Sequence, residues 1–464
     1  MSKSYPGFID SHMHFLGLGY TQTLISLEQV RSLEELYQTL KDQAHSSFVT
    51  ARGWNQELFV EKKYPSKDIL DVLFPDIPVV LIRICGHVAV INSAMQLRMD
   101  LSGVTLDPKT DLERGVFVEE DLHWIYQNTP KPTKKDLKRY LHIANQICLR
   151  QGVTRVASDD FCIFDLPYTD ILDAMLEAYD EGLIHVDITE QVHLATMESL
   201  QDFLSKGYAN KTFRPRFRMG PLKLLADGSL GGRTAALLEV YSDDPGNRGV
   251  LTFSDDVIFS LIDLAATYQM PSAIHAIGDL ATTQVLNAME KSMALPNRAR
   301  GHAIIHAQMV NEQHMKQMIR LGIGAIVQPI FLNSDILMAQ DRLGERAKHS
   351  YLFKTMSKSG ITVGFSTDCP VETISPFENI AVAISRKSLK FPEVDRYPGE
   401  DPFTIDEALY HYTTGNLPFV GGISFGDEIL LSHDLSDVHG DEWRQVRVLQ
   451  TKIDGIVVYE NRTL

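Results

Sequence analysis

Two histidines near the start of the chain, His12 and His14, have the residue type and spacing of metal ligands. They lie at the end of a short apolar stretch, 7–11, that is typical of a β-strand. Because alternate side chains of a strand share one face, both imidazoles would point the same way. Two imidazoles side by side make half of a divalent-metal site. The pair alone is equally consistent with two ordinary histidines, so later strands must supply further ligands.

Further ligand types stand at the ends of later apolar stretches. His275, His306 and Asp368 each end a stretch that is typical of a strand, and Lys223 lies within another. In a barrel of parallel strands, the C-terminal strand ends meet at one mouth, where active sites lie. We therefore expect His275, His306 and Asp368 to meet the histidine pair in space. Imidazole and carboxylate ligands suit zinc, with manganese, iron and nickel as alternatives.

The elements that must position these residues alternate between strand and helix. Short, mostly apolar strands separated by helices indicate parallel βα units covered on the outside. Eight such strands predict an α/β fold, a closed TIM (β/α)8 barrel. An open doubly wound sheet is the alternative, but no Gly-x-Gly-x-x-Gly turn follows any strand. The predicted strands are 7–15, 152–159, 185–189, 221–228, 271–275, 301–306, 324–328 and 362–368.

The alternation stops after the first strand and changes again near the end of the chain. Residues 1–17 are assigned to barrel strand 1, 18–133 to a large insertion and 134–419 to the remainder of the barrel. Residues 420–464 contain three short predicted strands. This last segment is therefore expected to be a small β appendage, a reduced β-sandwich.

Composition argues against several classes of function. Acidic side chains outnumber basic ones by 60 to 44, giving a formal charge of −16, which is unlike a nucleic-acid-binding protein. The four cysteines form no Cys-x-x-Cys pair, so neither a disulfide framework nor a thiolate metal site is indicated. No signal peptide or membrane-spanning run is apparent. We expect a cytoplasmic protein that acts on a small molecule, without nucleic-acid or membrane partners.

Short motifs with chemical side chains recur along nearly the whole chain. They are Gly7 to His14, Gly53-Trp54-Asn55, Arg83 to His87 with Asn92-Ser93, Gly115 to Glu119, Lys223 to Gly231 with Arg233-Thr234-Ala235, His275 to Asp279, His306-Ala307-Gln308, Gln328-Pro329 and Ser366 to Pro370. Together they resemble the amidohydrolase superfamily of metal-dependent hydrolases. Within it they are most similar to the group of YtcJ-like proteins and N-substituted formamide deformylase. The motifs are specific for the family and not for a substrate.

The resemblance implies a metal centre of one or two ions. His12, His14 and Asp368 would bind the first ion. Lys223, carboxylated on its amine, would bridge to a second ion, because a plain ammonium group would repel a cation. The other ligands of the second ion would be His275 and His306.

The implied reaction is hydrolysis of a C–N bond in an amide, an N-formyl group or a cyclic amide. A metal lowers the pKa of bound water to about 7 and makes hydroxide available. The second metal or His306 would polarise the carbonyl, and Asp368 would carry a proton to the leaving amine. Ester or lactone hydrolysis is an alternative, as is a metal-binding assembly protein without catalysis. Residues expected to face the substrate are Trp54, His87, Asp227, Arg233 and Gln328.

The chain departs from the family pattern at its start. Relatives carry a segment before the Pro-Gly-Phe-Ile-Asp motif that forms half of a small β-sandwich, whereas here the motif begins at Pro6. The C-terminal appendage is therefore expected to be reduced, completed in another way, or left with an open edge. An open edge tends to recruit a strand from another chain, which predicts a homodimer.

Overall fold

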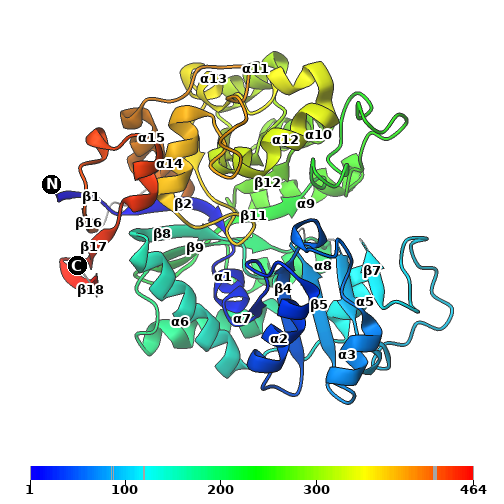
Figure 1. The fold of residues 1–464 in the computed structure, drawn as a ribbon. Helices are drawn as coiled ribbons and strands as arrows, with labels where there is room; N and C mark the ends of the chain where they lie inside the picture. Colours follow the sequence, from blue (N-terminus) through cyan, green and yellow to red (C-terminus); the bar gives the residue numbers. More distant parts are fainter. Residues whose placement is uncertain (1, 85, 87, 119–120, 422–425, 463–464) are drawn as a thin grey trace. The chain divides into compact units, whose positions relative to one another are not determined.

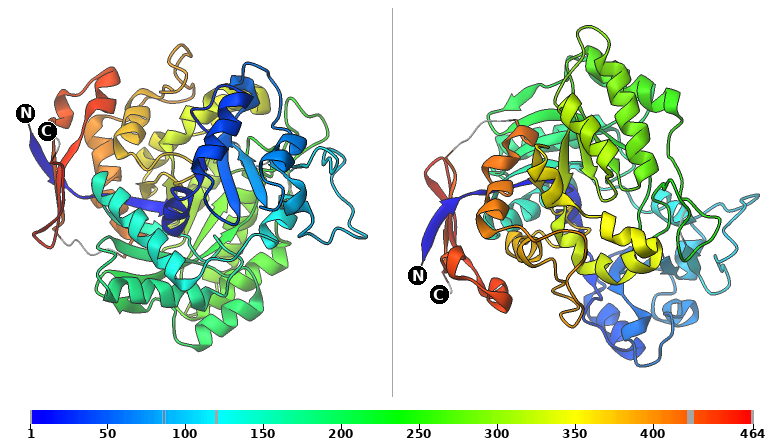
Figure 2. Two further views of the ribbon diagram at one scale, coloured as in Figure 1. Left: turned by 60° about the horizontal axis from the view of Figure 1, so that its bottom comes forward. Right: turned by 90° about the horizontal axis from the view of Figure 1, so that it is seen from above.

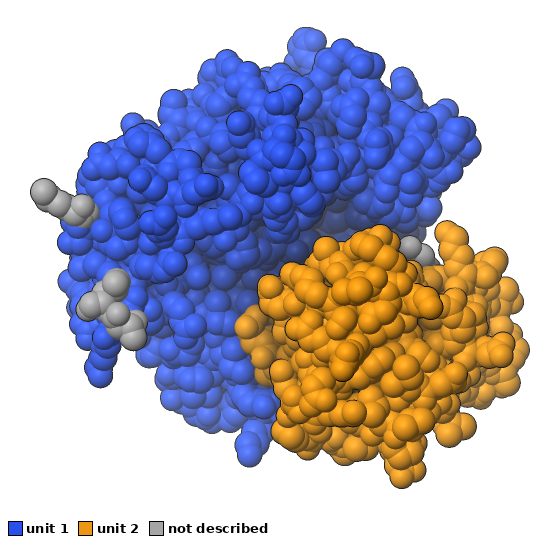
Figure 3. All heavy atoms as spheres, in the orientation of Figure 1, with its two compact units in different colours: residues 1–19, 134–464 blue, residues 20–133 orange. Residues whose placement is uncertain are grey.

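The structure is a computed structural model that describes residues 2–84, 86, 88–118, 121–421 and 426–462. The chain divides into two compact units (Figure 3). Unit 1 consists of Met1–Gly19 and Lys134–Leu464, and unit 2 of Tyr20–Thr133. Among the described residues, no helix is both long enough and apolar enough to cross a membrane.

Unit 1 contains the predicted barrel of eight parallel strands, which confirms the fold class. Each strand pairs with its neighbours in chain order, and the short β10 (Thr212–Arg214) adds to one of them in antiparallel orientation. The first and last strands are linked by hydrogen bonds from Asp368 N to His12 O (2.9 Å) and from His14 N to Cys369 O (2.7 Å). The strands are β2 (Phe8–Met13), β8 (Val153–Ser158), β9 (Asp187–His193), β11 (Phe217–Leu225), β12 (Ser272–Ala276), β13 (Ala303–His306), β14 (Gly324–Val327) and β15 (Val363–Phe365).

Helices surround the strands, as Figures 1 and 2 show. The barrel strands are buried on both faces, because side chains fill the interior and helices cover the outside. The helices that follow successive strands are α1 (Phe15–Thr21), α6 (Lys134–Arg150), α7 (Tyr168–Asp180), α8 (Met197–Ser205), α9 (Asp255–Thr267), α10 (Asp279–Met293), α11 (Glu312–Leu321), α12 (Leu332–Leu343), α13 (Phe353–Lys358), α14 (Pro376–Ser385) and α15 (Ile405–His411).

The segment between β14 and β15 differs from the single helix that the sequence predicts over 346–359. It contains α12, a 3₁₀ helix over Gly344–His349, and α13. Two residues in the left-handed region interrupt the helical path, Gly344 with φ 56° and Tyr351 with φ 54°. A left-handed residue cannot continue a right-handed helix, so the segment breaks into shorter pieces.

A four-stranded antiparallel sheet joins the two ends of the chain. Its order is β1 (Lys3–Pro6), β16 (Glu428–Leu431), β17 (Val448–Ile453) and β18 (Ile456–Glu460). Residues 3–6, which the sequence places in barrel strand 1, therefore belong to this sheet. The physical reason is burial: β1 is largely exposed, and every residue of the following strand, β2, is buried. The appendage is thus completed by the N-terminal segment.

Unit 2 is a five-stranded mixed sheet covered on both faces. Its order is β3 (Ile25–Ser26), β4 (Val49–Trp54), β5 (Val79–Arg83), β6 (Val88–Ile91) and β7 (Val116–Val118). Alternation along β5 separates two cores, with Val79 and Leu81 in one, and Val80 and Ile82 in the other. Its helices are α2 (Leu33–Gln43), α3 (Lys67–Leu73), α4 (Ser93–Gln96) and α5 (Leu122–Gln127).

Candidate metal centre

The histidine pair lies at the C-terminal end of β2, inside the barrel. His12 is buried, and its Nδ1 lies 2.6 Å from Gln191 Oε1. His14 Nδ1 lies 2.7 Å from the main-chain oxygen of Asp159. Both acceptors are carbonyl oxygens, so each Nδ1 carries the hydrogen and donates it. In the neutral imidazoles, the lone pair of each ring is therefore on Nε2.

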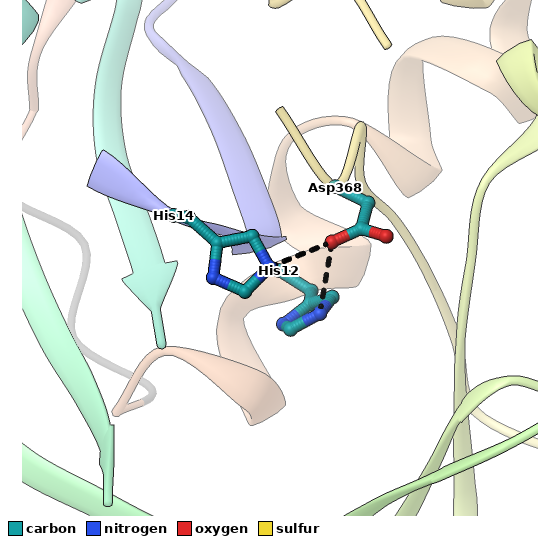
Figure 4. Close-up of side chains that lie close together, drawn as sticks. All are labelled: His12, His14 and Asp368. Carbon is teal, nitrogen blue, oxygen red and sulfur yellow. Dashed lines mark ion pairs between the residues drawn. The ribbon is translucent and has the colours of Figure 1, made fainter. Parts of the chain in front are cut away.

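The Asp368 carboxylate lies beside the Nε2 atoms of both rings (Figure 4). Its Oδ1 lies 3.3 Å from His12 Nε2 and 3.2 Å from His14 Nε2. This oxygen is buried and makes no hydrogen bond within the described residues. Three lone-pair atoms that converge in a buried space repel one another unless a cation lies between them. The donor set, two imidazoles and a carboxylate, fits a divalent metal ion such as zinc.

Backbone contacts hold Asp368 in an unusual conformation. Its φ is 57°, in the left-handed region, which concentrates at functional sites when the surroundings impose it. Asp10, buried in β2, accepts from Thr367 Oγ1 (2.6 Å), Thr367 N (3.2 Å) and His12 N (3.2 Å). One carboxylate thus ties the strand that carries the histidines to the loop that carries Asp368.

The charges of this group are set by burial and by its own neighbours. Burial alone would raise the pKa of Asp368, but the adjacent His12 and His14 hold it well below its usual value. Burial lowers the pKa of His12, which keeps this ring neutral, as a metal ligand must be. For His14, burial is outweighed by Asp368, and the pKa is raised well above its usual value. A cation, either a proton or a metal ion, is therefore favoured between His14 and Asp368.

Two further predicted ligands, His275 and His306, lie close together at the same mouth. Their ring centroids are 4.4 Å apart, and the His306 centroid is 5.8 Å from that of His12. His306 Nδ1 lies 2.8 Å from Gln328 Oε1, which leaves Nε2 as its free nitrogen. His275 is oriented the other way: Nε2 lies 3.0 Å from the Gly228 carbonyl oxygen, which leaves Nδ1 free. The structure thus brings both residues to the site with different nitrogens available.

Lys223 of β11 is buried and forms an ion pair with Asp159, Nζ to Oδ2 at 3.1 Å. The same carboxylate lies 3.2 Å from His193 Nδ1 and 3.3 Å from Cys162 Sγ. Burial alone would raise the pKa of Asp159, but Lys223 and His193 hold it well below its usual value. Burial acts to lower the pKa of His193, yet Asp159 raises it to about 9.

Asp159 and His193 belong to the group around Lys223 at the candidate site, and the sequence predictions leave them out. Asp159 directly follows β8, and His193 is the last residue of β9. Both occupy the C-terminal strand-end position used to select His275 and His306. Applying that rule to the predicted strand 152–159 would have identified Asp159, whereas the third strand is predicted to end at residue 189 and continues to His193 only in the structure.

The residues predicted to face the substrate have other contacts. Asp227 accepts from the main-chain N–H groups of Ile277 (3.0 Å), Gly278 (2.8 Å) and Ala236 (2.9 Å), and so organises the loop around His275. Arg233 forms an ion pair with Asp243 at 2.8 Å.

Gln328 holds His306, as described above. Trp54 is fully buried in the core of unit 2, where its indole N–H donates to the Leu81 carbonyl oxygen at 2.9 Å. His87 lies outside the described residues.

Comparisons with known proteins identify the family of the chain. The model of the Amidohydrolase family matches residues 4–459. The chain is 31% identical to putative amidohydrolase YtcJ of Bacillus subtilis, over 98% of this chain and 89% of that protein. It is 25% identical to N-substituted formamide deformylase of Arthrobacter pascens, over 98% of this chain and 88% of that protein.

Solved structures with the same architecture include two uncharacterized metal-dependent hydrolases. The protein from Pyrococcus furiosus is 30% identical, with a TM-score of 0.77 over 93% of this chain and 88% of that chain. The protein from Pyrococcus horikoshii is 28% identical, with a TM-score of 0.79 over 94% of this chain and 87% of that chain.

Proposed function

We propose that this chain, which belongs to the amidohydrolase family and is a metal-dependent hydrolase, cleaves a C–N bond in an amide, an N-formyl group or a cyclic amide. The observation that carries the proposal is the convergence of His12 Nε2, His14 Nε2 and Asp368 Oδ1, an oxygen that makes no hydrogen bond within the described residues. The names of the deformylase and of the putative amidohydrolase among its relatives support the choice of bond.

The metal we propose is zinc, in a centre of one or two ions. His12, His14 and Asp368 would hold the first ion, because their donor atoms all lie within 4.8 Å of one another. A bound zinc ion lowers the pKa of water to about 7 and polarises a carbonyl group. His306 Nε2 and His275 Nδ1 would hold the second ion, since these nitrogens are left free by the other contacts of the rings.

Asp368 is proposed as the proton carrier of the reaction. Its low pKa keeps it ionised at neutral pH, so it can accept a proton as the attacking water is deprotonated. It would then pass that proton to the departing nitrogen, which leaves as an amine. His306, whose ring stacks against Phe331 with centroids 5.7 Å apart, is placed to contact the substrate carbonyl in a one-ion centre.

Carboxylation of Lys223 belongs to the two-ion form of this proposal. Its Nζ lies 3.1 Å from Asp159 Oδ2, so a carbamate there would place two anions side by side. The positive charge of two metal ions would offset that repulsion. We therefore expect the carbamate to depend on metal.

The experiment is a matched substrate panel with protein purified without chelator and supplied with zinc. Aryl amides, N-formyl amines and cyclic amides are compared with the esters and lactones of the same skeletons. Faster hydrolysis of the nitrogen series than of the oxygen series supports the proposal. Faster hydrolysis of the oxygen series would assign an esterase or lactonase instead, and metal binding without turnover of either series would argue against catalysis.

A further inference from the structure

We infer that Gln191 and Gln328 are positioning residues that hold His12 and His306 in the tautomer protonated on Nδ1, and so aim both Nε2 atoms at the metal. This inference rests on the proposed metal centre. It assigns a role to two buried amides, one of which, Gln191, neither the sequence motifs nor the comparisons single out.

The orientation of the Gln191 amide is determined at both of its ends. Its Nε2 lies 3.2 Å from the Ser11 carbonyl oxygen, which can only accept a hydrogen bond. The amide nitrogen must therefore face Ser11, and Oε1 must face His12 Nδ1 at 2.6 Å. An amide oxygen can only accept, so the hydrogen of the neutral ring is on Nδ1.

The orientation of the Gln328 amide is determined by two successive hydrogen bonds. Its Nε2 donates to Ser366 Oγ at 2.8 Å, and that hydroxyl donates to the Val327 carbonyl oxygen at 3.3 Å. Because the hydroxyl hydrogen is used on Val327, its oxygen accepts from Gln328. Oε1 then faces His306 Nδ1 at 2.8 Å.

Because these hydrogen bonds are buried, they determine the tautomers of both rings. His12, Gln191, His306, Gln328 and Ser366 are all at least 98% buried, so water does not compete for these groups. A ring protonated on Nε2 would set two acceptors, Nδ1 and the amide oxygen, against each other without a hydrogen between them. It would also place a hydrogen on the nitrogen that a metal requires.

Neutral amides also avoid adding charge. Asp159, Asp227 and Asp368 are among the carboxylates buried at this mouth. A carboxylate next to a ligand histidine would orient the ring equally well but would add a further negative charge. Two glutamines orient the rings and leave the charge of the centre unchanged.

The test compares four variants: Gln191→Met, Gln328→Met, Gln328→Glu and Gln284→Met. Methionine keeps the length of glutamine and removes the acceptor. Gln328→Glu keeps an acceptor toward His306, and the hydroxyl of Ser366 can rotate to donate to the new carboxylate. Gln284→Met is the matched control, since Gln284 is also buried but its amide donates to the Phe253 carbonyl oxygen and to Asp255 instead of contacting a histidine of the metal site.

Two measurements are made on each variant. Histidine tautomers are read from long-range ¹H–¹⁵N correlations of metal-free protein labelled with ¹⁵N-histidine, with His12→Asn and His306→Asn used to assign the signals. Zinc affinity is measured by competition with a chromophoric chelator. We expect both methionine variants at the site to lose the Nδ1–H signature of the affected ring and to bind zinc about 10- to 100-fold more weakly. Gln328→Glu and Gln284→Met should retain the wild-type tautomers.

An unchanged tautomer in Gln191→Met and Gln328→Met would overturn the inference, whatever their zinc affinity. A loss of affinity in Gln284→Met as large as at the site would also overturn it, because the effect would then be general destabilisation. If wild-type protein bound no zinc, the proposed function would fail, and the tautomer spectra of the metal-free protein would still decide the role of the glutamines.

Discussion

The two halves of the proposed metal centre differ in the contacts that their donor atoms make. In the first half, Asp368 Oδ1 lies 3.3 Å from His12 Nε2 and 3.2 Å from His14 Nε2, and it makes no hydrogen bond within the described part of the chain. In the second half, Lys223 is paired with Asp159, and His275 Nε2 contacts Gly228 O and Asp227. The first half is already arranged for a cation. The second half must give up an ion pair, or be chemically modified, before it can bind one.

The largest effect is expected from Asp368→Asn, which removes both a ligand of the first half and the proton carrier. We expect kcat to fall by about 10³-fold, because general acid–base catalysis contributes on that order. Steady-state kinetics with saturating zinc measures the effect. Asp263→Asn, at a carboxylate of α9 that pairs with Arg298, is the control. A variant at Asp368 with the full hydrolytic rate would contradict the mechanism.

Zinc titration of metal-free protein should separate the two halves. We expect the first ion to bind at least tenfold more tightly than the second, since only the second must displace the Lys223–Asp159 pair. Bound metal is measured by mass spectrometry after equilibrium dialysis, and the carbamate by ¹³C NMR in the presence of ¹³CO₂. The carbamate signal should appear with the second ion and disappear with chelator. Equal affinities, or a carbamate in metal-free protein, would remove the distinction between the halves.

Asp159→Asn tests what the buried ion pair contributes. Removing one partner of a buried pair leaves an uncompensated charge and typically costs about 3 to 5 kcal/mol. We expect a loss of about 3 kcal/mol in the free energy of unfolding of the metal-free protein, measured by urea denaturation. The loss should be smaller with two zinc ions bound, because Lys223 is then carboxylated and no longer needs a carboxylate partner. An equal loss in both forms would mean that Lys223 stays an ammonium group.

A smaller effect is expected from His302, a buried histidine outside both halves. Its Nδ1 accepts from Ser272 N at 3.0 Å, and burial lowers its pKa to about 4. An unfolded histidine titrates near 6.5, so the unfolded chain binds more protons between pH 6.5 and 4. The free energy of unfolding should therefore fall as the pH drops through this window, by up to about 3 kcal/mol from this residue.

Urea denaturation at pH 5 and pH 7 in the presence of chelator measures this pH dependence. His302→Asn should reduce the difference in stability between the two pH values. The same substitution at the exposed His349 is the control. If the two variants had the same pH dependence, His302 would not be a source of the acid sensitivity.

Strand-end histidines were predictable because barrel topology converts a position in sequence into a position in space. His12, His275 and His306 each end or nearly end a strand whose apolar residues mark it clearly. Gln191 and Gln328 were not assigned these roles in advance, because a glutamine in or after a strand has no distinctive spacing. Their role depends on which carbonyl or hydroxyl lies beside the amide, and only the folded chain shows that.

The pairing of β1 with β16 was also not predicted from the sequence, for a different reason. A four-residue, largely exposed strand has too few residues to show a period of two. Its partner lies more than 400 residues further along, as the Lys3–Asp434 contact shows. Local pattern carries no information on such a pairing.

The contact between Asp10 and Thr367 joins residues 357 positions apart, and it closes the site proposed for the first metal ion. During synthesis, the strand with both histidines is made at the start and must wait for most of the chain before Asp368 exists. Contacts of such long range form late, since their ends must meet after the intervening chain has folded. The metal would then bind only after the barrel has folded, so bound metal would indicate a completely folded barrel.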